Sequence, residues 1–146
     1  MESIEDRNVA VVRRYFEGCN SGDLAVLQST VTEDVIHYFL PHTFPTLRGA
    51  EHLARFWRKF HVTLRGVWRI DEILADGDRV VGEWSCLWTE PGEGVRVMSR
   101  GTEWYILRGG RIAEVRAYFQ ATEIADSELI DFPYAGRGYL TRAGVS

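Results

Sequence analysis

Residues 97–119, VMSRGTEWYILRGGRIAEVRAYF, consist of two segments rich in β-forming residues with a turn between them. The turn contains Gly109-Gly110, a strong signal for a two-residue hairpin turn because both positions tolerate a positive φ. Alternate side chains of a strand point to opposite faces, so Val115, Ala117 and Phe119 form an apolar face of the second strand. Which face of the first strand joins them decides whether Glu103 is a buried acid or a surface charge.

The rest of the chain predicts helices first and strands afterwards. Ser3 with Asp6 marks a helix start, Asp23 opens a second short helix, and a third helix is expected over residues 50–60. A strand is expected over residues 35–40, after a break at residues 32–34, and the pattern is that of strands from Val62 onward. This order indicates an α+β domain, with helices on one face of a curved sheet that encloses a cavity.

Length and composition limit the class of protein. The 146 residues suffice for one domain, and the net charge of −4 argues against a nucleic-acid partner. Aromatic residues make up 12%, and such side chains often line cavities. The acidic start MESIEDRN is unlike a signal peptide, and no apolar stretch has membrane-spanning length. Cys19 and Cys86 show no CxxC spacing, which favours free thiols and a cytoplasmic protein; no metal motif or cofactor site is evident.

Several short motifs occur in a characteristic order. They are Arg14-Tyr15-Phe16, Asn20-Ser21-Gly22-Asp23, Glu33-Asp34-Val35, Leu47-Arg48-Gly49, Arg55-Phe56-Trp57, Gly110-Arg111-Ile112 and Arg116-Ala117-Tyr118-Phe119. With them the chain resembles the nuclear transport factor 2-like superfamily, and within it the SnoaL-like polyketide cyclases and ketosteroid isomerases. The resemblance covers about Glu5 to Phe119.

This resemblance implies a conical α+β barrel. Three N-terminal helices would pack on the concave face of a strongly curved, mixed and mostly antiparallel sheet. Residues 1–146 would form a single SnoaL-like domain with a core at about 5–120. The tail, 121–146, lies beyond the resemblance, and the sequence leaves its role open between closing the cavity and clasping a dimer partner.

The resemblance also assigns roles to individual positions. Tyr15 falls where ketosteroid isomerases place an oxyanion-hole tyrosine, and Glu103 falls near their protonated carboxylic acid. The position of the general base falls on Phe39, which cannot accept a proton. Epoxide-hydrolase-like members need a set of two Asp and one Arg, and the last Asp would fall on Ala117, so hydrolysis is disfavoured.

Two histidines are candidates for the missing base, because imidazole titrates near neutral pH. His37 shares a strand face with Phe39, which the resemblance points inward; the alternative is a core histidine that is hydrogen-bonded to the backbone. His42 lies in a loop flanked by prolines at the expected cavity mouth, where it could equally be solvated.

The orientation of Glu103 depends on the strand register. If Glu103 faces the apolar wall with Tyr105, desolvation raises its pKa and makes it a proton donor or shuttle. A slip of one residue would instead put Trp104 inside. Tyr15 could donate a hydrogen bond to a substrate oxygen, or it could only pack between helix and sheet. The face with Trp84 competes with that of Glu83 for the interior, and apolar content favours the tryptophan. The expected substrate-binding residues are Phe39, Trp57, Trp84, Trp88, Tyr105 and Phe119.

These residues predict a cofactor-independent acid–base enzyme of the isomerase, cyclase or dehydratase (lyase) type. It would act on a hydrophobic carbonyl-containing small molecule, with His37 or His42 as base and with Tyr15 and Glu103 polarising the enolate oxygen. The alternative is a noncatalytic small-molecule-binding or dimerisation module of the same fold. The enzymatic hypothesis requires His37 and Glu103 on the same face of the sheet.

The other sheet face mixes large aromatics with charges, a composition typical of protein interfaces. We therefore expect a homodimer through this outer face, and neither a nucleic-acid nor a membrane partner. The residues of the face are Arg100, Thr102, Trp104, Arg116 and Tyr118.

Overall fold

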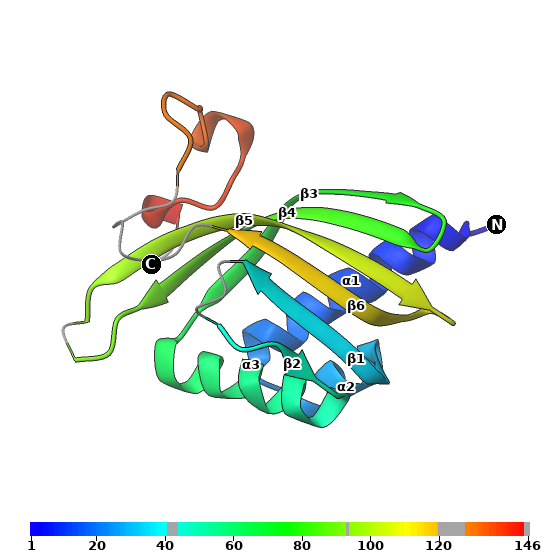
Figure 1. The fold of residues 1–146 in the computed structure, drawn as a ribbon. Helices are drawn as coiled ribbons and strands as arrows, with labels where there is room; N and C mark the ends of the chain where they lie inside the picture. The colour runs from blue at the N-terminus through cyan, green and yellow to red at the C-terminus, as the bar shows by residue number, and fades with distance from the viewer. Residues whose placement is uncertain (41–43, 93, 120–127, 145–146) are drawn as a thin grey trace.

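The computed structural model describes residues 1–40, 44–92, 94–119 and 128–144. The elements in chain order are α1 (Ile4–Ser21), α2 (Leu24–Thr30), β1 (Val31–Leu40), β2 (Leu47–Arg48), α3 (Ala50–Leu64), β3 (Val67–Asp76), β4 (Arg79–Thr89), β5 (Arg96–Arg108) and β6 (Arg111–Phe119) (Figure 1). Short 3-10 helices at Ala135–Arg137 and Arg142–Gly144 follow. The predicted α+β order, with one strand among three helices and then a run of antiparallel strands, is confirmed.

Local sequence signals determine where the first two helices begin. The Ser3 hydroxyl accepts the Asp6 amide at 3.0 Å and the Asp6 carboxylate accepts the Ser3 amide at 3.3 Å, which forms the expected capping box. Asp23 caps α2 by accepting the amides of Ala25 and Val26. These side chains satisfy backbone donors that would otherwise lack a helical partner.

The third helix is longer than predicted. It continues to Leu64, so the expected strand character of residues 62–64 is wrong. No glycine or proline interrupts this segment, and the helix ends only where Arg65 takes a left-handed conformation with φ 50°. The extra turn matters for function because it carries further side chains to the cavity described below.

The six strands form one sheet in the order β2-β1-β6-β5-β4-β3. Strand β1 pairs in parallel with β6, and the other neighbours are antiparallel. Residues 32–34 belong to β1, contrary to the expected break, and the register with β6 shifts between Val31 and Ile36. The short β2 was not predicted, because two residues are too few to show a period.

The hairpin of β5 and β6 has the predicted turn. Gly109 and Gly110 have φ values of 60° and 77°, conformations that side-chain-bearing residues seldom adopt. The pairing places Glu103 opposite Ala117. Glu103 therefore lies on the same face as the apolar side chains of β6, and its predicted inward orientation is confirmed.

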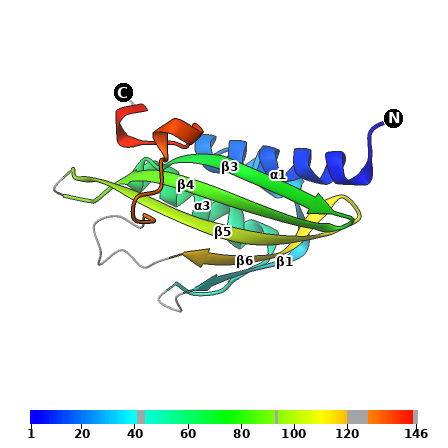
Figure 2. The ribbon, with the colours of Figure 1, turned by 90° about the horizontal axis from the view of Figure 1, so that it is seen from above.

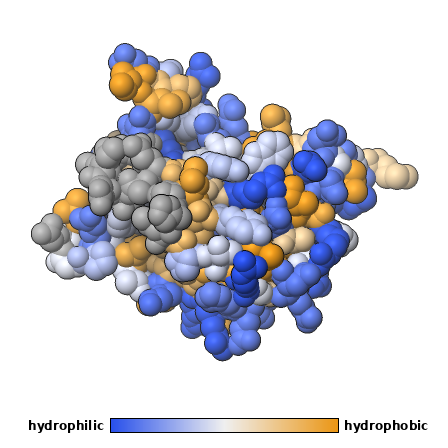
Figure 3. Space-filling model, in the orientation of Figure 1, coloured by the Kyte–Doolittle hydropathy of each residue, from blue (hydrophilic) through white to orange (hydrophobic). Residues whose placement is uncertain are grey.

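The helices lie together on one side of the sheet, which we call the inner face (Figure 1 and Figure 2). The main core fills the space between this face and the helices; examples of its residues are Val12, Leu27, Leu53, Val80 and Val115. Figure 3 shows hydrophilic residues along the lower edge, where α3 lies in Figure 1. Among the described residues, no helix has both the length and the apolar character needed to cross a bilayer.

The described part of the tail, residues 128–144, packs against the opposite side of the sheet, the outer face (Figure 2). Leu140 joins a small apolar cluster with Leu87 and Met98. The Arg100 guanidinium donates to the Leu140 carbonyl at 3.0 Å and lies 3.7 Å from the centre of the Tyr134 ring. Arg100 is therefore buried, and its expected exposure on the outer face is wrong because the tail covers it.

Candidate functional site

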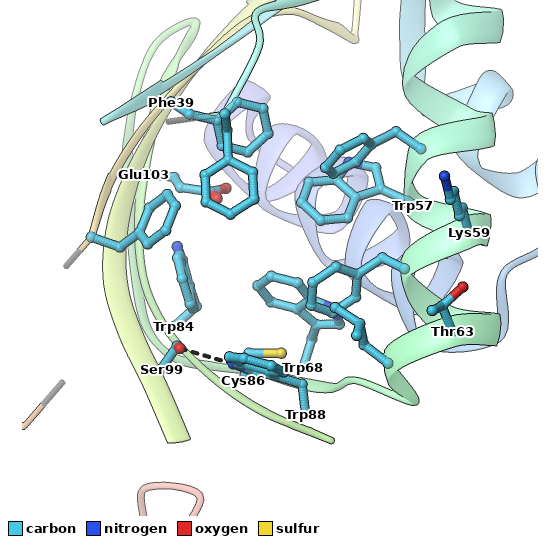
Figure 4. Close-up of a pocket in the computed structure, with 15 residues that line it drawn as sticks. Phe39, Trp57, Lys59, Thr63, Trp68, Trp84, Cys86, Trp88, Ser99 and Glu103 are labelled. Carbon is cyan, nitrogen blue, oxygen red and sulfur yellow. Dashed lines mark hydrogen bonds between the residues drawn. The ribbon is translucent and has the colours of Figure 1, made fainter. Parts of the chain in front are cut away.

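A cavity of about 350 Å³ lies between α3 and the inner face of the sheet (Figure 4). This volume is within the range of small-molecule sites, about 300–1,000 Å³. Aromatic rings make up most of its wall: Phe39, Phe44, Phe56, Trp57, Phe60, Trp68, Trp84, Trp88 and Phe119. The site therefore suits a hydrophobic guest, especially one with rings that can stack on these side chains.

The periods of the elements place these rings. On α3, Phe56, Trp57 and Phe60 share the stripe that faces the sheet. On β4, alternation places Trp84, Cys86 and Trp88 on the inner face, as the apolar content of that face predicted. The alternating positions Glu83 and Ser85 point to the outer face instead: Glu83 accepts a hydrogen bond from Tyr139 of the tail, and Ser85 donates one of 2.6 Å to Asp71 on β3.

Glu103 brings an acid into this apolar wall. Its residue is only 3% exposed, and its carboxylate accepts a hydrogen bond of 2.5 Å from the Tyr105 hydroxyl. Burial raises the pKa of Glu103 to about 7, although the neighbouring Tyr105 and Trp84 favour the charged form. A carboxyl with this pKa exchanges its proton readily near neutral pH, so it can act both as acid and as base.

His37 lies on the same face but behind the cavity wall. Its ring is 0% exposed and stacks on the Phe39 ring at a centroid distance of 4.1 Å, so that Phe39 rather than His37 lines the cavity. Neither ring nitrogen forms a hydrogen bond of standard geometry among the described residues, although the backbone of His37 and Tyr38 lies close enough to favour the protonated ring. Burial lowers the pKa of His37 to about 3, which keeps the imidazole neutral.

The sheet register relates His37 to Glu103. Phe39, Ala117 and Glu103 are paired across β1, β6 and β5 and form one row. His37 belongs to the adjacent row of paired residues. The two candidates therefore share a face, as the enzymatic hypothesis requires, but only Glu103 reaches the cavity.

The two tyrosines also lie behind the wall. Tyr15, on α1, accepts a hydrogen bond of 2.6 Å from the Trp57 indole N–H and does not line the cavity. Burial raises the pKa values of Tyr15 and Tyr105 well above the ordinary value. The expected direct contact of Tyr105 with a substrate is not supported, because Tyr105 is packed beneath Glu103 and does not line the cavity.

The other predicted site residues divide as follows. Phe39, Trp57, Trp84, Trp88 and Phe119 all line the cavity. His42 lies outside the described residues. Within the described part of the chain, no group of three or more His, Cys, Asp or Glu side chains is placed to hold a metal ion.

Sequence reasoning missed part of the lining. Phe56 and Phe60 could have been found, because both lie on the apolar stripe of α3 beside Trp57. Phe44 belongs to the proline-flanked segment that was expected to be a loop, and a segment without a hydrophobic period gave no pattern that pointed to it. Polar side chains were also missed: Lys59 and Thr63 on α3, and Ser99, which accepts the Trp88 indole N–H at 3.0 Å.

Comparison with known proteins places these features in context. The sequence matches the profile of the SnoaL-like domain family over residues 12–115. A protein of unknown function with a cystatin-like fold from Methylobium petroleophilum PM1 is 32% identical, with a TM-score of 0.71, over 94% of this chain and 93% of that one. No curated protein matches the sequence.

Two more distant structures share the fold. A candidate SnoaL-like polyketide cyclase from Jannaschia sp. CCS1 is 21% identical (TM-score 0.70), over 82% of this chain and 90% of that chain. An LEH-like epoxide hydrolase from M. tuberculosis is 20% identical (TM-score 0.69), over 80% and 84% of the two chains. Proteins with this fold thus differ in chemistry, so the function has to be inferred from the residues of the site.

Proposed function

Because the chain belongs to the SnoaL-like domain family, we propose that it is a cofactor-independent acid–base enzyme of the isomerase, cyclase or dehydratase type. Its substrate is a hydrophobic carbonyl compound held in the aromatic cavity. The observation that carries the proposal is the Glu103 carboxyl, which lines an apolar cavity and has a pKa of about 7.

In this mechanism Glu103 transfers the proton. Its ionised form takes a proton from the carbon next to the substrate carbonyl; the C–H bond breaks, an O–H bond forms, and the electron pair moves into an enolate. The protonated carboxyl then returns the proton to another carbon, or to a departing hydroxyl group. The apolar rings keep water away, so the enolate is not quenched at random.

His37 and Tyr15 have supporting roles in this proposal. For His37 to act as the base, the Phe39 ring stacked on it would have to move aside. A pKa of about 3 makes His37 a weak base, so Glu103 is the better candidate. Tyr15 acts through its hydrogen bond with Trp57, which orients one ring of the cavity wall. Hydrolysis of epoxides is not favoured, because Ala117 has no carboxylate to activate water.

The test is proton exchange on a probe substrate. An aromatic ketone such as 2-tetralone is incubated in D₂O, and loss of its α-proton signal is followed by NMR. The wild-type protein should accelerate exchange, with a rate that rises through the Glu103 pKa of about 7 as the base ionises. Glu103→Gln should lower the acceleration by about 100- to 10,000-fold.

The control is Glu114→Gln, on the same hairpin but paired with Arg116 rather than placed in the cavity. This variant should exchange the probe at the wild-type rate. Equal exchange by wild type and Glu103→Gln would refute the role of Glu103.

One observation favours a second function, a noncatalytic ligand-binding module of the same fold. Neither His37 nor Tyr15 lines the cavity, so among the described residues Glu103 has no second acid–base group of the predicted set beside it. Binding of the ketone without exchange, in both wild type and Glu103→Gln, would support this alternative.

A further inference from the structure

The cavity has an acidic group at one side and a basic group at the other. Of the described residues that line it, Glu103 and Lys59 are the members with acidic or basic side chains. Figure 4 shows Glu103 on the sheet side and Lys59 on the side of α3. The remaining lining is largely aromatic and cannot neutralise a charge on a ligand.

Lys59 marks the end of the cavity that meets solvent. Its residue is exposed, whereas Glu103 is buried. The next helical turn presents Thr63, which is also exposed and also lines the cavity. An ammonium and a hydroxyl thus lie side by side at the mouth, four residues apart on one face of α3.

No described carboxylate is paired with Lys59. Its neighbours one helical turn away are Arg55 and Thr63, and neither is acidic. The nearest acid on the same helix, Glu51, forms an ion pair of 2.5 Å with Arg55. The Lys59 ammonium is therefore available to an anion that enters the cavity from solvent.

We propose that the ligand of this cavity is an aromatic carboxylate that binds with its ring system among the aromatic side chains and its carboxylate at Lys59 and Thr63. This inference rests on the proposed function, because it uses the same cavity. The reverse orientation would place two carboxyl groups together in an apolar site, and each would disfavour ionisation of the other. The carbonyl end of the ligand is thereby directed toward Glu103, where the proton transfer takes place.

The test compares two probes with the same ring system, the anion 2-naphthoate and its uncharged methyl ester. Binding is followed by quenching of tryptophan fluorescence, at a pH below the Glu103 pKa of about 7 so that this carboxyl is neutral. Wild type should bind the carboxylate about two- to fivefold more tightly than the ester, the range for a partly solvated ion pair. Added salt should reduce this preference.

Variants of the helix surface locate the effect. Lys59→Met should abolish the preference for the carboxylate, and Lys59→Glu should reverse it. Arg58→Met is the matched control, because Arg58 is an exposed cation on the same helix that does not line the cavity; it should keep the wild-type preference.

The outcomes separate this inference from the proposed function. Equal binding of the two probes by wild type, or an undiminished preference in Lys59→Met, overturns the carboxylate assignment and leaves the cavity as a ligand site. Failure of wild type to bind either probe overturns both.

Discussion

Glu103 and His37 lie in adjacent rows on the inner face of the sheet, and burial moves their pKa values in opposite directions. Desolvation disfavours the charged form of each group, so the carboxyl keeps its proton and the imidazole loses one. Just below neutral pH both groups are therefore largely uncharged. The interior can therefore hold both side chains without ion pairs. Their protonation states at a given pH differ from those of the same side chains in water.

The first prediction concerns the substitution His37→Leu. Between about pH 6.5 and pH 3, the unfolded chain protonates this histidine but the folded protein does not. The wild-type free energy of unfolding should therefore decrease as the pH falls through this window, by up to about 1.4 kcal/mol per pH unit from this residue. His37→Leu lacks this term, so it should become progressively more stable relative to wild type at lower pH.

Urea denaturation at several pH values measures this difference. His52→Gln, on the exposed surface of α3, is the control and should follow the wild-type curve. A constant difference between His37→Leu and wild type over the whole window would contradict the prediction.

For single residues, the sequence predicts the sheet face on which a side chain lies better than the neighbours against which that side chain packs. The inward side of Glu103 follows from the period of two and from its pairing with Ala117. The complete burial of His37 and its stack with Phe39 could not be predicted, because they depend on how β1, α1 and α3 pack together.

At the scale of elements, β5 packs tightly against its neighbours at Gly101. A Cβ atom built there would lie 2.6 Å from Cζ2 of Trp84 and 2.8 Å from the Tyr118 carbonyl oxygen. The absence of a side chain leaves room for the ring of Trp84, which is paired with Gly101 across the two strands and forms part of the cavity wall. This glycine therefore shapes the cavity although it does not line it.

The second prediction compares two glycines of the sheet. Gly101→Ala should lower the free energy of unfolding by about 1–3 kcal/mol, because the methyl group must displace a ring and a backbone atom. It should also weaken binding of the naphthyl probes. At Gly82 a Cβ would meet its nearest neighbour, Tyr105, at 3.5 Å, so Gly82→Ala should change stability by less than about 1 kcal/mol.

Thermal unfolding and fluorescence titration of the two variants provide the measurement. Similar behaviour of Gly101→Ala and Gly82→Ala would show that the wall around Trp84 is loosely packed, against the prediction.

The elements that the sequence predicted well have long, regular patterns or explicit caps. The capping box at Ser3 and the Gly-Gly turn are examples. The bulged start of β1 and the last turn of α3 were missed, because there tertiary pairing overrides local preference.

For the molecule as a whole, the tail changes the predicted interface. Arg100 is covered, but Trp104 and Tyr118 remain 37% and 46% exposed on the outer face. Arg116 lies 6.0 Å from the Trp104 ring and completes the uncovered patch. A homodimer through this patch stays a prediction of the composition, now restricted to the part of the outer face beyond the described tail.

The third prediction tests this dimer. Sedimentation at micromolar concentration should show a dimer for wild type, and Trp104→Lys should shift it to monomer because it places a second cation beside Arg116, where an interface would desolvate both like charges. Val62→Asp, an equally drastic change at an exposed apolar position on α3, should leave the dimer intact. If the wild-type protein sediments as a monomer, the predicted homodimer is wrong.

The fold class and the face of Glu103 followed from the sequence because they rest on periods repeated along the chain. The position of the tail did not follow from the sequence. Residues 128–144 have no hydrophobic period and are held by separate side-chain contacts, such as that of Arg100 with Tyr134. Contacts of this kind are decided by which surfaces remain free once the sheet has formed.

The parallel pairing of β1 with β6 has a consequence for biosynthesis. Strand β1 leaves the ribosome early, yet its long partner ends at Phe119, and only the two-residue β2 is available to it in the meantime. The nascent chain must therefore carry the edge of β1 that pairs with β6 unpaired through most of its translation, although α3, made soon after β1, can already cover the apolar face with His37 and Phe39. Such late, non-local closure slows folding and leaves a strand edge exposed to other chains while the rest of the protein is still being made.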